Sequence, residues 1–292
     1  MGEQLHRIQS GDFTLVASEL PAAGTARGVV VAGHAMMCNR STLDRPPGGG
    51  LASVLAQAGL HVYTFDFRGH GESGAGAGAG GRWSYDDFVN HDLPAVVAWA
   101  RARHPDLRLG IFGHSLAGHA ALHWLGQSPD APVDALAMYA ANVWVPGFEP
   151  SFVRWLQKRA VLSLWLLVSR AFGYYPARKM RMGTDDESLG LVADFNRWAK
   201  TGRCLRQSDG ADYLAGLARV RPPVLAYSGE KDGLFCVPEC ARRYLASVPD
   251  HAHRSVPAAT HMSLVLSRRS RPVWEETAKW FLEKLGKPAA GA

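Results

Sequence analysis

Residues 107–124 read LRLGIFGHSLAGHAALHW, and this stretch decides the fold that we expect for the chain. A short apolar run of strand type ends in a tight turn of small residues, and apolar residues at helical spacing follow the turn. Ser115 lies at the apex of the turn. Small residues on both sides let the strand and the helix approach closely, so the turn holds Ser115 in a strained conformation with its hydroxyl exposed. The free N–H groups of the helix then face the space above that hydroxyl.

Strand and helix patterns alternate on both sides of this stretch. The strand patterns are a hairpin over 6–20 and single strands over 27–32, 60–65, 133–139, 223–228 and 253–256. The helix patterns are 50–58, 83–104, 238–247 and 272–285. This order predicts an α/β fold, in which helices flank a mostly parallel central sheet with right-handed crossovers.

One long segment interrupts the alternation. Residues 142–219 show no strand pattern, and 152–172 within them are strongly apolar. The charge-free part, Ala160 to Ser169, is too short to span a bilayer and fits a buried or interfacial helix. We therefore expect a helical cap inserted after the strand that ends near residue 140, with 1–141 and 220–292 forming the core. Because an apolar helix must bury its face, we expect the cap to cover the sheet edge at Ser115.

Composition limits the class of protein. The chain has 292 residues, of which 47% are hydrophobic and 20% charged, which fits one large α/β domain or a domain with an insertion. Its four cysteines form no C-x-x-C pair, so we expect free thiols, a reducing compartment and no metal site. The start, MGEQLHRIQSGDF, lacks the apolar run of a signal peptide. These features predict a cytoplasmic protein without a transmembrane segment.

The positive charge is concentrated in one region. Residues 151–210 hold 11 Lys/Arg against 5 Asp/Glu, an excess of 6 that equals the formal net charge of +6. Two interpretations remain open: a solvated basic face, or a surface that attracts an anionic substrate, a carrier or a membrane. No pattern indicates a nucleic-acid partner, and the sequence leaves the oligomeric state open.

A glycine-rich segment raises the question of a nucleotide cofactor. Residues 74–81 read GAGAGAGG and formally contain G-x-G-x-x-G. A dinucleotide-binding loop must follow a strand directly and open a helix, whereas this segment begins well after its strand. We therefore expect a loop here and no cofactor.

Three residues in strand-end loops form a candidate catalytic set. Ser115, Asp232 and His261 each follow a predicted strand, in the order Ser, Asp, His. Because parallel strands share one carboxyl edge, residues far apart in sequence meet there. A serine becomes nucleophilic when an imidazole takes its proton and a buried carboxylate orients that imidazole. Taken singly, Asp232 could be a turn residue and His261 a capping residue, but their joint order and placement favour a catalytic triad.

Such a triad needs two N–H groups that stabilise the negative oxygen formed during attack. The backbone N–H of Leu116, directly after the serine, supplies the first. The loop after the strand over 27–32 supplies the second, and we expect the backbone N–H of His34, with Ala35 as the alternative.

With these residues the chain resembles the α/β-hydrolase superfamily over nearly its whole length. The matching motifs, in order, are DFRGHGES (66–73), GHSLAG (113–118), SGEKD (228–232) and THMS (260–263). The resemblance implies the α/β-hydrolase fold and the serine triad. The segments FGYYP (172–176) and FNRW (195–198) further resemble a bacterial group of capped hydrolases.

Two positions depart from the superfamily pattern. Ala117, two residues after the serine, replaces the usual glycine and crowds the turn. Ala32-Gly33 stands where His-Gly is usual, which leaves the second N–H donor open between His34 and Ala35.

The sequence thus predicts a serine hydrolase that cleaves a small-molecule carboxylic ester or thioester with an apolar acyl or aryl group. Two alternatives stay open. The same acyl-enzyme could pass its acyl group to an alcohol or amine, which would make the protein an acyltransferase. A non-catalytic binding protein could also retain the fold. The natural substrate, its acyl length and its leaving group do not follow from the sequence.

Overall fold

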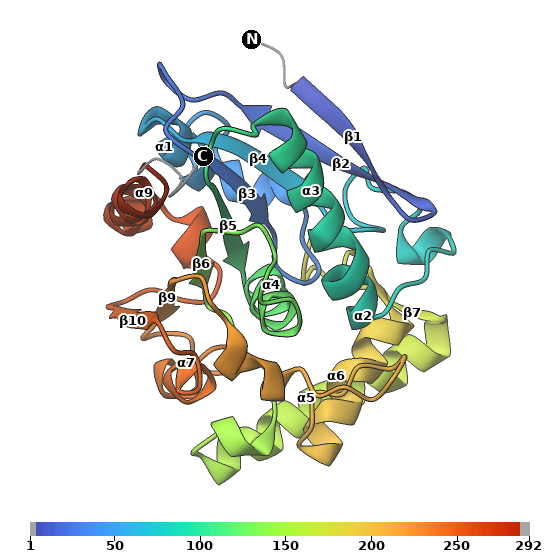
Figure 1. The fold of residues 1–292 in the computed structure, drawn as a ribbon. Coiled ribbons are helices and arrows are strands. Elements are labelled where there is room, and N and C mark those ends of the chain that lie inside the picture. Colours follow the sequence, from blue (N-terminus) through green and yellow to red (C-terminus); the bar gives the residue numbers. More distant parts are fainter. Residues whose placement is uncertain (1–3, 287–292) are drawn as a thin grey trace.

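The computed structural model describes residues 4–286 and contains an eight-stranded sheet (Figure 1). In sheet order the strands are β1 (Gln4–Ser10), β2 (Phe13–Leu20), β4 (His61–Asp66), β3 (Val29–Gly33), β5 (Leu109–His114), β6 (Ala135–Tyr139), β9 (Val224–Gly229) and β10 (His251–Val256). The β1–β2 and β2–β4 pairs are antiparallel. All strands from β4 to β10 pair in parallel, so their carboxyl ends share one edge.

Helices cover both faces of this sheet. The α-helices are α1 (Leu51–Gln57), α2 (Tyr85–Asp87), α3 (Leu93–Arg103), α4 (Leu116–Gln127), α5 (Phe152–Phe172), α6 (Leu189–Thr201), α7 (Pro238–Leu245), α8 (Ser263–Leu266) and α9 (Arg271–Leu285). Short 3₁₀ turns occupy Arg40–Asp44, Ala77–Ala79, Pro146–Phe148, Leu214–Arg219 and Arg268–Ser270.

Two apolar cores lie on opposite sides of the central strands. Along β3, Val29 and Val31 pack into the core that includes α3 and α4, whereas Val30 packs into the core that includes α1 and α9. Successive side chains of a strand point to opposite faces, so a strand that is covered on both faces is apolar throughout. This explains the unbroken apolar run of β3 and confirms the predicted α/β architecture.

The helix expected over 83–104 forms from Tyr85, after the N-cap Ser84, to Arg103, but it is not α-helical throughout. Between α2 and α3 the backbone makes a π-helical turn over Phe88–Asp92. Pro94 stands in the first turn of α3. A proline has no N–H to donate to the preceding turn, and the wider turn accommodates the missing hydrogen bond.

The segment 142–219 lies between β6 and β9 and contains α5 and α6 (Figure 1). It also contains two short antiparallel strands, β7 (Tyr174–Tyr175) and β8 (Glu187–Ser188), where the sequence showed no strand pattern. Two residues are too few to produce a recognisable alternation. No described helix of the chain is long and apolar enough to cross a bilayer.

Helix α5 buries one apolar side, in a cluster that includes Leu162 and Trp165, but it also exposes more apolar surface than expected. Its exposed apolar residues are Phe152, Val153, Leu156, Leu164, Leu167 and Phe172. The buried side includes Leu162 and Trp165 but also Lys158, whose ammonium donates a hydrogen bond to Glu149 at 2.8 Å. A buried ammonium needs such a partner, so the ion pair between Lys158 and Glu149 contributes to the packing of α5.

Glycines allow the close approach of β5 to α4 that the turn at Ser115 requires. A Cβ atom on Gly113 would lie 2.4 Å from the backbone nitrogen of Gly118, and one on Gly33 would lie 2.7 Å from the Cβ of Ala117. Gly33 and Gly113 are partners in the β3–β5 register. Gly33 therefore leaves the space that Ala117 occupies, and the departure from the usual glycine is accommodated.

We expect Gly113→Ala to lower the free energy of unfolding by about 1–3 kcal/mol, because the new methyl group meets backbone atoms of α4 that cannot move aside. Chemical denaturation measures the loss. Gly147→Ala is the matched control, since no atom lies within 4 Å of a Cβ at that position, and its stability should stay within about 0.5 kcal/mol of the wild type. Equal stability of the two variants would contradict the role of Gly113.

Candidate active site

Ser115 lies between β5 and α4 in a strained backbone conformation. Its φ is +51° and its ψ is −107°, a region that residues with a Cβ rarely adopt. The Ser115 N–H donates to the carbonyl oxygen of Tyr139 at 2.8 Å, and the Ser115 carbonyl accepts from the N–H of His119 at 3.1 Å. Strand β6 and the first turn of α4 thus fix the serine from both sides.

Asp232 and His261 converge on this serine. His261 Nε2 lies 3.0 Å from Ser115 Oγ, and His261 Nδ1 lies 2.7 Å from Asp232 Oδ2. Asp232 follows β9, and His261 follows β10. The three residues are 29 to 146 positions apart in sequence, and the shared carboxyl edge of the parallel strands brings them together.

The Asp232 carboxylate is buried but well supplied with donors. Its two oxygens accept the backbone N–H groups of Phe235 and Cys236, each at 2.9 Å. Burial alone would raise its pKa, but the bond from His261 and these backbone donors outweigh burial and hold the pKa below its usual value. An ionised Asp232 favours the tautomer in which His261 Nδ1 carries the proton, which leaves Nε2 free to accept the proton of Ser115.

Sequence reasoning did not identify His114, which lies beneath His261. Its Nε2–H donates to the backbone oxygen of His261 at 3.1 Å. Burial, together with the neighbouring His261, lowers the pKa of His114 to about 3, so this imidazole is neutral. The signal in the sequence was its position directly before Ser115 at the end of β5.

The two residues expected to supply the second N–H donor differ in their surroundings. Ala35 lines the pocket at Ser115, as does Leu116. The His34 side chain is fully buried, with Nδ1 donating to the oxygen of Ala35 at 2.8 Å and Nε2 accepting the N–H of Phe67 at 3.1 Å. Both ring nitrogens of His34 are thus engaged, and only its backbone N–H is a candidate for the oxyanion.

Glu187, from the segment 142–219, holds the loop after β3 in place, and sequence reasoning missed it. Its carboxylate accepts the N–H of Met37 at 2.7 Å, His70 Nε2 at 2.9 Å and Trp83 Nε1 at 3.3 Å. Burial lowers the pKa of His70, but the charge of Glu187 outweighs it and raises that pKa to about 9. A buried ion pair therefore joins the inserted segment to His70 in the loop after β4, and the hydrogen bond from the Met37 N–H joins it to the loop that carries Ala35.

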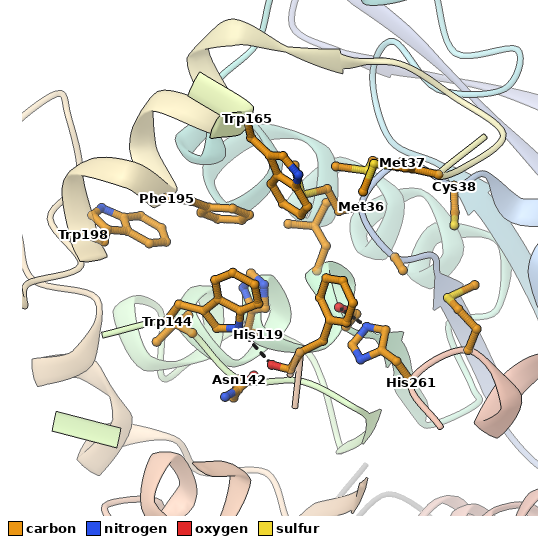
Figure 2. A pocket seen from close by; sticks show the side chains of 17 residues that line it. Met36, Met37, Cys38, His119, Asn142, Trp144, Trp165, Phe195, Trp198 and His261 are labelled. Atoms are coloured by element: carbon orange, nitrogen blue, oxygen red, sulfur yellow. Dashed lines mark hydrogen bonds between the residues drawn. The ribbon is translucent and has the colours of Figure 1, made fainter. Parts of the chain in front are cut away.

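A cavity of about 200 Å³ opens at the serine (Figure 2). The core and the inserted segment line it together, mostly with apolar side chains: Met36, Met37, Val143, Trp144, Trp165, Met182, Phe195, Trp198 and Phe235. Sequence reasoning also missed two polar lining residues, His119 and Asn142. The spacing of four residues between Ser115 and His119 could have indicated the first, because such residues share a helix face.

Within residues 4–286, no cluster of His, Cys, Asp or Glu has the arrangement of a metal site. The four cysteines are buried free thiols.

Solved structures resemble this fold over almost their whole length. A soluble variant of monoglyceride lipase from Saccharomyces cerevisiae, in complex with a substrate analogue, has a TM-score of 0.75 at 15% identity, covering 98% of this chain and 97% of that one. The monoacylglycerol lipase of Paleococcus ferrophilus has a TM-score of 0.63 at 18% identity, with coverages of 92% and 99%. A thermophilic esterase from Thermogutta terrifontis has 0.65 at 16% identity, with 96% and 98%. At these identities the likeness establishes the fold.

No curated protein sequence matches the chain. The resemblance to a bacterial group of capped hydrolases stays a prediction. A family model, described as serine aminopeptidase, S33, matches residues 26–265. That match spans most of the chain and includes Ser115, Asp232 and His261. Together with the mostly parallel sheet, it identifies the chain as an enzyme of the α/β-hydrolase superfamily that belongs to the Hydrolase_4 family, serine aminopeptidase, S33.

Proposed function

We propose that this enzyme hydrolyses a carboxylic ester or thioester with an apolar acyl or aryl group, through an acyl-enzyme on Ser115. One observation carries the proposal: Ser115, His261 and Asp232 form an unbroken chain of hydrogen bonds of 3.0 and 2.7 Å at the floor of an apolar cavity. The names of the structural neighbours, two lipases and an esterase, point to the same reaction class.

In this mechanism the Ser115 oxygen attacks the substrate carbonyl while His261 Nε2 takes the hydroxyl proton. Asp232 stabilises the resulting imidazolium. The negative oxygen of the tetrahedral intermediate accepts the backbone N–H groups of Leu116 and His34, with Ala35 as the alternative second donor. His261 then gives its proton to the leaving group, and a water that it activates releases the acyl group from Ser115.

We further propose that residues 142–219 are a cap domain on a core of residues 1–141 and 220–292. The support is the lining of the cavity, because Trp144, Trp165, Phe195 and Trp198 all come from this segment. Their side chains lie around the cavity in Figure 2. An apolar group of the substrate gains free energy when it leaves water for such a surface. The cap therefore selects the acyl or aryl part of the substrate.

Ser115→Ala should lower kcat by about 10⁴- to 10⁶-fold, because the nucleophile is removed. The melting temperature should stay unchanged, since alanine keeps the Cβ and the hydroxyl serves chemistry. Hydrolysis of a p-nitrophenyl ester measures the loss of kcat, and labelling by a fluorophosphonate probe tests whether Ser115 is the reactive serine. Ser163→Ala, at an exposed position of α5, is the control. Retention of more than a tenth of wild-type activity by Ser115→Ala would refute the assignment.

Asp232→Asn should reduce kcat by about 10⁴-fold, by analogy with the serine-protease triad. Phe235 N–H donates to Oδ1, whereas Cys236 N–H and His261 Nδ1 share Oδ2. A single amide oxygen cannot accept from all three donors, and the negative charge beside His261 is lost. Steady-state kinetics measure the effect, and Asp106→Asn, at an exposed position, should be neutral. Near-normal turnover by Asp232→Asn would place the acid elsewhere.

The apolar cavity predicts a rise of kcat/KM with acyl length. Each added methylene that the cavity buries contributes up to about 0.8 kcal/mol, nearly fourfold per carbon, until the cavity is full. The measurement is kcat/KM for acetyl, butyryl, hexanoyl and octanoyl p-nitrophenyl esters. In Trp165→Ala the increase of kcat/KM with acyl length should be smaller, because the cavity lacks the apolar surface of the indole ring. A series that is flat or falls from acetyl upward would contradict apolar selection.

A further inference from the structure

Two polar side chains that the proposed mechanism does not use line the apolar cavity. They are His119, in the first turns of α4, and Asn142, three residues after β6. Both are more than nine-tenths buried, with exposed fractions of 5% and 8%. Figure 2 shows both among the lining side chains. A buried polar group without a partner costs about 1–3 kcal/mol, so their hydrogen bonds need a full account.

His119 lies one helical turn after Ser115 and ends a buried chain of hydrogen bonds. His119 Nδ1 lies 2.8 Å from the Tyr85 hydroxyl, which lies 2.8 Å from His123 Nδ1. His123 Nε2 in turn lies 3.0 Å from the Tyr244 hydroxyl. Burial lowers the pKa of His119 to about 3 and that of His123 well below its usual value, so both rings are neutral and carry one proton each.

The Tyr244 end of this series of hydrogen bonds determines which atom donates and which accepts in each of them. The Tyr244 hydroxyl is fully buried, and among the described residues its partner is His123 Nε2, so its O–H donates there. His123 Nδ1–H must then donate to the Tyr85 oxygen, and the Tyr85 O–H must donate to His119 Nδ1. The proton of His119 is left on Nε2, which has no partner among the described residues. His119 therefore presents an N–H donor at the cavity.

Asn142 lines the same cavity as this donor. A Cβ atom on Gly118 would lie 2.7 Å from the Cβ of Ala141, so the residues directly before His119 and Asn142 are in contact. The amide nitrogen of Asn142 is buried without a hydrogen-bond partner among the described residues. Two residues that line the cavity thus each have an N–H donor without a hydrogen-bond partner among the described residues.

We propose that His119 and Asn142 form a polar subsite that binds a second carbonyl oxygen on the acyl chain of the substrate. This inference rests on the proposed function and narrows its substrate class to oxo-acyl esters. A carbonyl oxygen has two lone pairs and accepts from both donors without needing a donor in return. Residues one turn apart on a helix have Cβ atoms about 5–6 Å apart. The second oxygen therefore lies a few carbons from the carbonyl that Ser115 attacks.

The test compares oxo-acyl esters with their parents. The substrates are the p-nitrophenyl esters of 4-oxopentanoate, 5-oxohexanoate and 6-oxoheptanoate, each against the unsubstituted acid of the same length. Two neutral hydrogen bonds should raise kcat/KM of the best oxo ester about tenfold over its parent. A wild-type enzyme that prefers the parent, or makes no distinction, at all three lengths would overturn the proposal.

Two variants assign the preference to the subsite. Asn142→Leu removes no hydrogen bond within the described protein, so it should fold normally, and the ratio of oxo to parent kcat/KM should fall to about one or below. His119→Phe should have the same effect. Met36→Leu alters the lining without changing its polarity and should keep the ratio within about twofold. An unchanged ratio in Asn142→Leu would contradict the subsite.

A binding measurement separates this inference from the proposed function. Fluorescence of the cavity tryptophans reports the binding of 5-oxohexanoate and hexanoate to Ser115→Ala, where no turnover is needed. Tighter binding of the oxo acid, lost in the Ser115→Ala/Asn142→Leu double variant, supports the subsite even if the esters are not cleaved. Equal binding of the two acids would refute the subsite and leave ester hydrolysis intact.

Discussion

The contact between Gly113 and Gly118 is the constraint on which the site depends. With hydrogen atoms at both Cα positions, β5 and α4 approach so closely that Ser115 must take a positive φ between them. That conformation is strained for a serine, and the packing on both sides of the turn over-determines it. The hydroxyl is consequently directed out of the sheet edge, where the loops after β9 and β10 deliver Asp232 and His261.

Burial and hydrogen bonding set the charge states of the ionisable groups around this turn. Asp232 is held ionised by its donors, whereas His114 and His119 are kept neutral by burial. An ionised carboxylate next to His261 stabilises the imidazolium that forms during attack, and neutral rings nearby do not compete with it. These charge states support the proposed transfer of the Ser115 proton to His261.

The inserted segment does more than supply an apolar wall. Glu187 reaches back into the core and binds the N–H of Met37, in the loop that carries Ala35, while it pairs with His70. The position of the candidate oxyanion loop therefore depends on the insertion. Helix α5 exposes several apolar side chains. Its buried side combines the apolar packing of Leu162 and Trp165 with the hydrogen bond from Lys158 to Glu149.

The sequence by itself determined the order of strands and helices, the turn at Ser115, and the loops that hold Asp232 and His261. These features follow from local periodicity, turn residues and the rule that parallel strands share a carboxyl edge. Only the tertiary structure decided the roles of Glu187, His114 and the hydrogen-bonded chain from Tyr244 to His119. Their contacts join residues up to 150 positions apart. The sequence shows that a residue is histidine, but not whether its ring donates, accepts or carries a charge. Such roles depend on which atoms meet, and that is settled only when the packed side chains fix their rotamers and their distance from water.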